Sequence, residues 1–334
     1  MSELNICYIC NNTISYIEMM GVSIYSLIHN KAPSTKLNIY IIHNGIHKKY
    51  QEKLQSMVKE HVKLSFVLIP TELDNLLTIE PDTNYLGHTD TTYLGNSCLW
   101  RLCIPILFSN YERILYIDCD TLIRKDLAAL STIDFENNYC CATKTDFFNL
   151  NLFSYEYIKY QGKYYHKSTY YTKILDFPLE YFEKDKNPYI NAGVLLFNIP
   201  KINKDNLAQK LIDNVKPYKE CLILPDQDII AKTFGLQIKD LGIQYNFYTR
   251  DKDYHEAIII HVIGRKKPIH FSSWYRFYYF HEYIKYLQSS PFAKNKYLIP
   301  ILHVITKIRQ YLVCLENAFK FIIRKKKKKK LSSC

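Results

Sequence analysis

Two aspartates, Asp118 and Asp120, follow the short apolar run Ile114–Ile117 with one residue between them. A β-strand repeats every two residues, so both carboxylates can leave the end of such a strand on the same side. Ligands of open α/β sheets bind at the carboxyl ends of the strands. Two hard oxygen anions at that place supply half of a divalent-metal site, and the metal can in turn hold phosphate oxygens. The plain alternative is an acidic strand end that faces water.

Two further segments offer groups that could face a ligand at this site. Arg101 lies on a predicted helix just before the aspartate strand, and the run Asn191-Ala192-Gly193 opens a later apolar strand. Small residues in a strand let a ligand approach the backbone closely. Taken alone, Arg101 would more often belong to a surface salt bridge, so its assignment depends on the other groups.

Two later segments offer more direct chemistry. The run Asp226-Gln227-Asp228 follows Pro225 at the start of a predicted helix, where acidic residues are favoured. His261 and Lys267 follow a predicted strand, and they offer an imidazole as a third metal ligand and an ammonium group for a phosphate. Taken singly, Asp226 would be a helix N-cap and His261 a hydrogen-bonded strand histidine.

Apolar runs alternate with helical stretches over the first half of the chain. Strands are expected at Leu4–Cys10, Leu37–His43 and Lys63–Ile69, with helices at Tyr16–Asn30 and Lys48–Glu60 between them. This βαβ rhythm predicts an α/β fold with a mainly parallel sheet and helices on both faces. Further expected elements are strands at Arg113–Ile117, Asn191–Asn198 and Ile258–Val262 and an irregular surface insertion at Leu150–Lys186. Neither G-x-G-x-x-G nor a P-loop sequence occurs, which disfavours a Rossmann dinucleotide site and a P-loop nucleotide site.

The net charge of +12 is concentrated at one end of the chain. Arg324–Lys330 holds seven of the 44 basic residues, so the rest has 37 basic residues against 32 acidic ones. The basic residues are therefore concentrated in the C-terminal tail and give no sign of a nucleic-acid-binding groove.

Several of the ten cysteines lie in apolar runs, and the lone Cys7-x-x-Cys10 pair lacks the second pair typical of zinc sites. A reduced, cytoplasmic protein is expected, without a signal peptide or an apolar run long enough to span a membrane.

The chain changes character after Pro300. From Ile301 to Ile322, apolar residues recur at alternating spacings of four and three, which predicts one apolar stripe along a helix. Basic residues flank the stripe, and Lys325–Lys330 follow it. An amphipathic helix with a polybasic end is suited to an anionic membrane surface. The alternative is a helix docked on the main domain and followed by a solubilising tail.

Together and in this order, the motifs resemble glycosyltransferase family 8, particularly bacterial lipopolysaccharide and lipooligosaccharide galactosyl- and glucosyltransferases. The resemblance covers about residues 4–275 and is carried by Tyr116–Asp120, Asn191–Asn198, Asp226–Asp228 and His261–Pro268. The stretch Tyr283–Phe292 is also similar to the C-terminal extension of lipopolysaccharide core enzymes.

The resemblance implies a GT-A fold over residues 1–275, a helical extension over 276–334, a UDP-glucose or UDP-galactose donor, and Mn²⁺ or Mg²⁺ as cofactor. It assigns Asp118, Asp120 and His261 to the metal. It implies that Lys267 and the Gly264 backbone meet the diphosphate and that Tyr16 and Asn11 lie at the uracil. Arg101 and Asp226 would lie at the donor sugar, with Asn191, Ala192 and Gly193 along the donor site. Gln227 would lie beside the anomeric carbon and Asp146 near the acceptor.

Members of the family retain the anomeric configuration of the sugar. Gln227 is a neutral amide and a poor nucleophile, so one mechanism is same-face displacement through an oxocarbenium-like state. A covalent intermediate on Asp226 or Asp228 is the other, and the sequence leaves both open. Two positions depart from the family: Asn11-Asn12 stands where an Asp near the uracil is usual, and Ile269 stands where a Trp usually follows Lys-Pro.

We therefore expect a Mn²⁺-dependent retaining hexosyltransferase that acts on lipopolysaccharide, lipooligosaccharide or a related lipid-linked glycan. It would work at the inner face of the bacterial membrane as a peripheral protein with no nucleic-acid partner. A haloacid-dehalogenase-type phosphatase is one alternative, because Asp118–Thr121 fits its D-x-D-x-T motif. A catalytically silent sugar-nucleotide-binding protein is another, suggested by Asn11-Asn12. The sequence does not choose between glucose and galactose, nor does it give the acceptor, the linkage or the oligomeric state.

Overall fold

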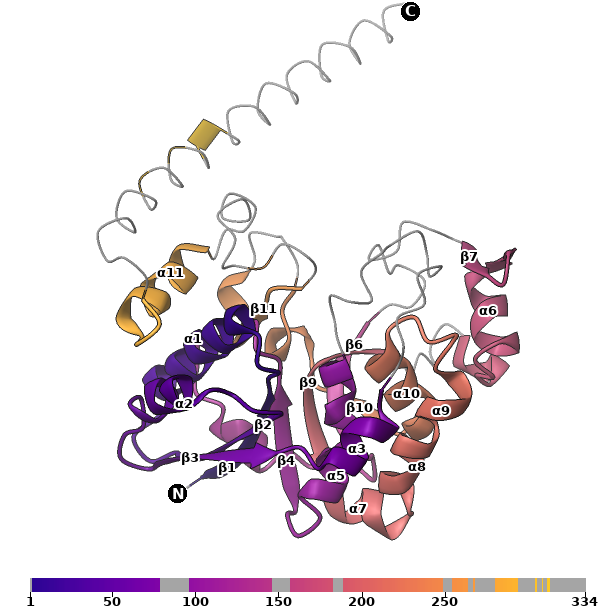
Figure 1. Cartoon of the computed structure of the whole chain (residues 1–334), viewed down its shortest axis with the longest axis horizontal. Coiled ribbons are helices and arrows are strands. Elements are labelled where there is room, and N and C mark those ends of the chain that lie inside the picture. Colours follow the sequence, from indigo (N-terminus) through magenta and orange to yellow (C-terminus); the bar gives the residue numbers. More distant parts are fainter. Residues whose placement is uncertain are drawn as a thin grey trace, which may run out of the picture.

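A seven-stranded sheet forms the centre of the protein, in the strand order β10-β6-β9-β4-β1-β2-β3 (Figure 1). The structure is a computed structural model, and it describes residues 2–78, 96–145, 157–182, 189–248, 254–263, 267, 280–293, 304, 308, 311 and 312. The strands of the sheet are β1 (Glu3–Ile9), β2 (Lys36–His43), β3 (Val62–Leu68), β4 (Arg113–Ile117), β6 (Cys140–Lys144), β9 (Ile190–Asn198) and β10 (Ile238–Asp240). Neighbouring strands are parallel except at β9, which runs antiparallel to β4 and β6. The mainly parallel, mixed α/β sheet expected from the sequence is confirmed.

Each face of the sheet carries its own hydrophobic core. Cys7 and Tyr116 point into one core, whereas Ile6 and Leu115 point into the other, as the two-residue repeat of a strand requires. Helices α1 (Ile14–Asn30) and α2 (Lys48–Gln55) cover one face (Figure 1). The opposite face is covered by the 3₁₀ helix η1 (Asn96–Cys103) and by α3 (Thr71–Leu76), α5 (Ile104–Leu107), α7 (Ile199–Lys204), α8 (Leu207–Asp213), α9 (Val215–Tyr218) and α10 (Pro225–Phe234).

Two expectations about the elements need correction. The helix predicted over Lys48–Glu60 ends at Gln55, because the chain turns there and reaches β3 through His61, whose φ is 62°. The described part of the insertion is more regular than expected. It contains the antiparallel hairpin of β7 (Tyr157–Tyr160) and β8 (Lys163–His166), the helix α6 (Lys167–Lys173) and the 3₁₀ helix η3 (Leu179–Phe182).

A second, two-stranded sheet lies beside the end of β4. It pairs β5 (Thr121–Ile123) with β11 (Ile259–His261) in antiparallel register. The remaining elements are the short 3₁₀ helices η2 (Ala128–Ser131), η4 (Ile243–Tyr245) and η5 (Tyr254–Glu256).

The last described helix, α11 (Phe280–Ser289), packs on α1 (Figure 1). The Arg124 guanidinium pairs with both carboxylate oxygens of Glu282 at 2.7 and 3.1 Å. Just after α11, the buried Phe292 ring lies against Gly21, where a Cβ atom would overlap the ring. The stretch that resembles a family extension is therefore attached to α1 by an apolar contact and to Arg124, which follows β5, by an ion pair.

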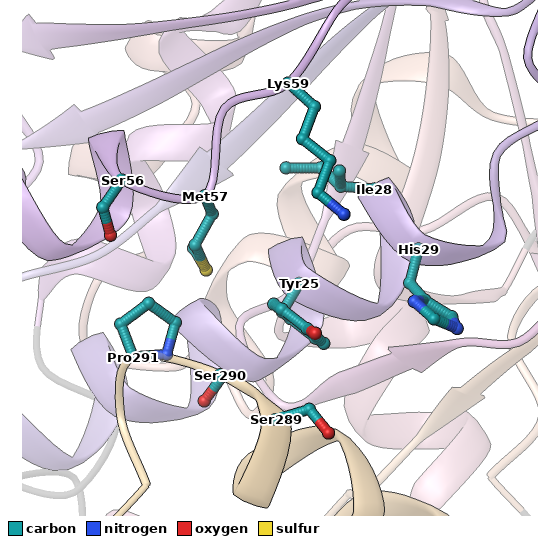
Figure 2. A pocket seen from close by; sticks show the side chains of 9 residues that line it. All are labelled: Tyr25, Ile28, His29, Ser56, Met57, Lys59, Ser289, Ser290 and Pro291. Carbon is teal, nitrogen blue, oxygen red and sulfur yellow. The ribbon is translucent and has the colours of Figure 1, made fainter.

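A cavity of about 350 Å³ lies at this junction (Figure 2). It is lined by Tyr25, Ile28 and His29 from the last turns of α1, by Ser56, Met57 and Lys59 after α2, and by Ser289, Ser290 and Pro291 at the end of α11. Because Tyr16 lies in the first turn of α1, the cavity is at the far end of that helix from the predicted uracil-binding residue. It is thus separate from the candidate active site.

Little of the predicted C-terminal amphipathic helix belongs to the described residues. Ile308 and Leu312 of its apolar stripe have helical backbone and are each 56% exposed. Arg324–Lys330 lies outside the described residues. Within the described part of the chain, none of the helices has the length and apolar character needed to cross a membrane.

Candidate active site

The site forms where β4 ends. Asp118 follows β4 directly, and the next strand, β5, begins at Thr121, so the two aspartates lie in the tight connection between them. β11 pairs with β5 so that His261 stands opposite Thr121, and the Val262 N–H donates to the Asp120 carbonyl at 2.9 Å. This pairing brings His261 beside the aspartates from a distant part of the chain.

Asp118, Asp120 and His261 form a group that fits a divalent cation. His261 Nε2 lies 3.3 Å from Asp118 Oδ2 and 3.2 Å from Asp120 Oδ1. Each residue offers one ligand atom, and these atoms all lie within 4.8 Å of one another. Two carboxylate oxygens and an imidazole nitrogen are ligands that Mn²⁺ and similar cations accept.

The charges around this group balance one another. Burial would raise the pKa of both carboxyl groups, but Arg101 and His261 lower the pKa of Asp118, and Lys267 and His261 lower that of Asp120. Burial would lower the pKa of His261, whereas Asp120 and Asp118 raise it to about 9. The two carboxylates are therefore ionised and require positive charge beside them.

Gly193 on β9 gives the imidazole its space. A Cβ atom at this position would overlap the His261 ring and lie 2.9 Å from Asp118 Oδ2. The Gly193 carbonyl also accepts the Asp118 N–H at 2.8 Å, which ties β9 to the end of β4. The sequence predicted that a ligand approaches the backbone closely at this glycine. In the structure, the His261 side chain of the protein itself makes that approach.

Arg101 connects the aspartate pair with the start of α10. One of its terminal nitrogens, Nη2, lies 3.0 Å from Asp118 Oδ1, and the other, Nη1, lies 2.8 Å from Asp226 Oδ2. Nη1 also donates to the Ala192 carbonyl at 2.6 Å, and the guanidinium stacks over the Tyr116 ring at 4.5 Å. Arg101 is buried at the centre of the site, so its ion pairs are not the surface salt bridge that was the alternative for this residue.

The first turn of α10 faces the same place. Pro225 is the first helical residue, and its missing N–H costs nothing at that position. The Gln227 side-chain oxygen accepts the Ala192 N–H at 3.2 Å, which joins α10 to β9. Burial raises the pKa of Asp226, and the Arg101 guanidinium opposes that rise.

Asp228 has different surroundings. One carboxylate oxygen accepts the hydroxyls of Tyr171 at 3.1 Å and Tyr189 at 2.7 Å. The other accepts the backbone N–H groups of Ile223 at 2.7 Å and Leu224 at 3.0 Å. Burial raises its pKa to about 6 despite these four donors.

The remaining predicted residues divide into three groups. Lys267 Nζ contacts Asp120 Oδ2 and donates to the Val262 carbonyl at 3.3 Å, so it belongs to the site. Tyr16 and Asn11 lie in and before the first turn of α1, at the end of β1, where Asn11 Oδ1 accepts the Thr13 N–H at 3.1 Å. Asp146 and Gly264 lie outside the described residues.

The structure adds two residues that sequence reasoning did not single out for a role. The Tyr116 hydroxyl donates to Asp118 Oδ1, and its place two residues before Asp118 on β4 was the available signal. Asn246 Oδ1 lies 2.9 Å from His261 Nδ1. Asn246 comes from the connection after η4, which has no periodicity that marks it.

Comparison with known proteins agrees with this geometry. The profile of glycosyl transferase family 8 matches residues 6–273. A putative glycosyltransferase of Haemophilus influenzae is 27% identical over 238 residues, which are 71% of this chain and 62% of that protein. General stress protein A of Bacillus subtilis is 25% identical over 296 residues, covering 81% of this chain and 90% of that protein.

Solved structures share the fold. The bifunctional glycosyltransferase WbbM superposes with a TM-score of 0.68 at 20% identity, covering 93% of this chain and 52% of that one. The galactosyltransferase LgtC, solved with donor and acceptor sugar analogs, gives a TM-score of 0.65 at 18% identity, covering 86% and 96% of the two chains. This chain thus spans about half of WbbM and nearly all of LgtC.

Proposed function

This chain belongs to glycosyltransferase family 8, and we propose that it is a metal-dependent, retaining hexosyltransferase that uses UDP-glucose or UDP-galactose. The observation that carries the proposal is the Asp118–Asp120–His261 group at the strand ends, in which Asp118 is half-buried and the other two are buried, beside two cations, Arg101 and Lys267. A family match over most of the chain leaves no support for the phosphatase alternative.

Asp118, Asp120 and His261 would hold Mn²⁺ or Mg²⁺. When bound, the ion supplies positive charge to the diphosphate that leaves with uridine. Lys267 contacts Asp120, which supports a role for its ammonium group at the same phosphates. Gly264 would add its backbone, and Tyr16 and Asn11 would bind the uracil. The Asn11 amide can hydrogen-bond a base edge as an aspartate would.

Arg101, Asp226 and Gln227 would face the donor sugar. The Gln227 oxygen is fixed by the Ala192 N–H, and the amide is neutral and a poor nucleophile. Both oxygens of Asp228 are engaged by four donors, so neither is available to attack a sugar. Asp226 is the carboxylate that points toward the aspartate pair, through Arg101. These contacts leave two mechanisms: same-face displacement beside Gln227, and a covalent intermediate with Asp226 as the nucleophile.

The acceptor is proposed to be a lipopolysaccharide, lipooligosaccharide or related lipid-linked glycan, with Asp146 near it. The exposed apolar residues Ile308 and Leu312 support attachment of the C-terminal segment to the inner face of the bacterial membrane. Attachment there would raise the effective concentration of a lipid-linked acceptor.

The direct test is release of UDP from a panel of UDP-sugars, measured with Mn²⁺ and with EDTA. We expect release from one hexose donor, and loss of at least about 100-fold in kcat for Asp120→Asn, because a buried ligand of the cation is removed. Asp213→Asn is the matched control, since Asp213 is exposed at the end of α8.

Two results would contradict the proposal. Equal release in EDTA would show that the cation is not needed. Tight binding of a UDP-sugar without release, even with a broad set of glycan acceptors, would favour the silent sugar-nucleotide-binding protein. That outcome would direct attention to Asn11-Asn12, where the chain departs from the family.

A further inference from the structure

We propose that Asn246 is a positioning residue that fixes which ring nitrogen of His261 faces the aspartate pair. The inference rests on the proposed metal-dependent function and adds to it a residue outside every motif of the family resemblance. Asn246 is completely buried, although it lies just after η4 and outside the helices and strands of the described chain. Buried amides are held by hydrogen bonds, and those of Asn246 lead to the site.

A chain of hydrogen bonds determines the orientation of each amide. The Gly193 N–H lies 3.0 Å from one side-chain atom of Asn191, and since a backbone N–H can only donate, that atom is the oxygen. One end of the Asn246 amide lies 2.8 Å from the same oxygen and 3.4 Å from the Asn191 carbonyl. Both neighbours are acceptors, so this end of Asn246 is its NH₂ group.

The other end of the Asn246 amide is therefore its oxygen, and it lies 2.9 Å from His261 Nδ1. An oxygen acceptor at this distance places a hydrogen on Nδ1. The opposite ring nitrogen, Nε2, faces Asp118 and Asp120 at 3.3 and 3.2 Å. When Nδ1 carries the hydrogen of a neutral imidazole, Nε2 has the lone pair that a metal ligand needs.

The backbone prevents Asn246 from moving away. The Asn246 N–H donates to the Ile243 carbonyl at 3.1 Å. Its neighbour Phe247 donates to Ile259 at 2.9 Å and accepts the His261 N–H at 2.9 Å. Asn246 and His261 thus lie on adjacent, hydrogen-bonded segments, with Gly193 leaving space for the ring. Such partners orient ligands, and their loss typically lowers metal affinity by about 10- to 100-fold.

Asn246→Leu tests this role because leucine keeps the size of the side chain and removes the oxygen. Mn²⁺ affinity of the full-length protein is measured from the electron paramagnetic resonance signal of the free ion. We expect a loss of about 10- to 100-fold. Asn198→Leu is the control: Asn198 ends β9, the strand that begins near the site, and donates to the Asn138 carbonyl at 3.0 Å. Its Mn²⁺ affinity should equal that of the wild type.

A second readout reports the ring nitrogen itself. In metal-free protein labelled with ¹⁵N-histidine, His261 should give a slowly exchanging Nδ1–H signal, assigned by its absence in His261→Asn. The signal should persist in Asn246→Asp, which keeps an oxygen acceptor, and disappear in Asn246→Leu. A role in packing alone would not distinguish these two variants in this way.

The outcomes separate the two proposals. A folded Asn246→Leu variant with wild-type Mn²⁺ affinity and an intact Nδ1–H signal would overturn the role of Asn246. If the wild-type protein bound no Mn²⁺, the proposed metal-dependent function would fail, and the Nδ1–H signal would still decide whether Asn246 fixes the ring.

Discussion

At the scale of single residues, Asp226 and Asp228 show how position on a helix separates two similar side chains. A helix turns by about 100° per residue, so two residues that are two positions apart point to nearly opposite sides. Asp226 faces Arg101 at 2.8 Å and through it the aspartate pair. Asp228 faces Tyr171 and Tyr189 in the core. We therefore assign Asp228 to the support of α10, whereas the position of Asp226 supports its proposed place at the donor sugar.

Asp228→Asn tests this assignment through the pH dependence of stability. The folded-state pKa is raised from the ordinary 3.8 to about 6, so the folded protein binds a proton more tightly than the unfolded chain. The stabilisation from this group is complete below about pH 4 and is lost as pH rises through about 6. The free energy of unfolding of the wild type relative to Asp228→Asn should therefore fall by about 2–3 kcal/mol between pH 4 and 7. Urea unfolding at each pH measures it, and parallel curves would contradict the assignment.

At the scale of elements, much of the fold could be predicted because strands with apolar repeats carry their own signal. β4 matched its predicted range, β1 and β3 were shifted from theirs by one residue, and β2 began one residue earlier than predicted. α2 was predicted too long, because the sequence Ser56–Glu60 is compatible with a helix, whereas in the structure the chain turns there toward β3. The contact of Asn246 with His261 could not be predicted, since it depends on pairing between segments that have no shared pattern.

The docking of α11 gives a prediction at the same scale. Alanine in place of a helical glycine normally stabilises by about 1 kcal/mol. At Gly21, the new Cβ atom would overlap the Phe292 ring, so Gly21→Ala should destabilise the protein. Phe292→Ala should cost about 3–5 kcal/mol, as for other buried aromatic residues. In that background Gly21→Ala should become stabilising. Urea unfolding of the wild type, the two single variants and the double variant gives the four free energies of unfolding that measure this change of sign. If the effects of Gly21→Ala and Phe292→Ala simply added, the packing of Phe292 on Gly21 would be contradicted.

At the scale of the whole molecule, positive charge has two separate locations. Inside the fold, Arg101 is paired with Asp118 and Asp226, and Lys267 with Asp120, so these cations serve the site. Seven of the net twelve positive charges lie at Arg324–Lys330. Between the two, exposed apolar residues have helical backbone at Val304, Ile308, Tyr311 and Leu312. We propose that this order of charges and apolar groups lets the chain rest on an anionic surface while its site remains open to a soluble donor.

Removal of the tail tests this arrangement. Deletion of Arg324–Cys334 should reduce binding to vesicles that contain anionic lipid by at least about tenfold, since each basic residue near such a surface contributes about 1 kcal/mol. Sedimentation with vesicles measures the bound fraction. Raising the salt concentration should weaken vesicle binding by the wild type but not by the truncated protein.

Replacing Lys325–Lys330 with glutamine keeps the length of the chain and should reproduce the loss of vesicle binding. Release of UDP from soluble donor should not change in either variant, because both leave the Asp118–Asp120–His261 group intact. Equal vesicle binding by wild type and both variants would show that the tail does not hold the protein at a membrane.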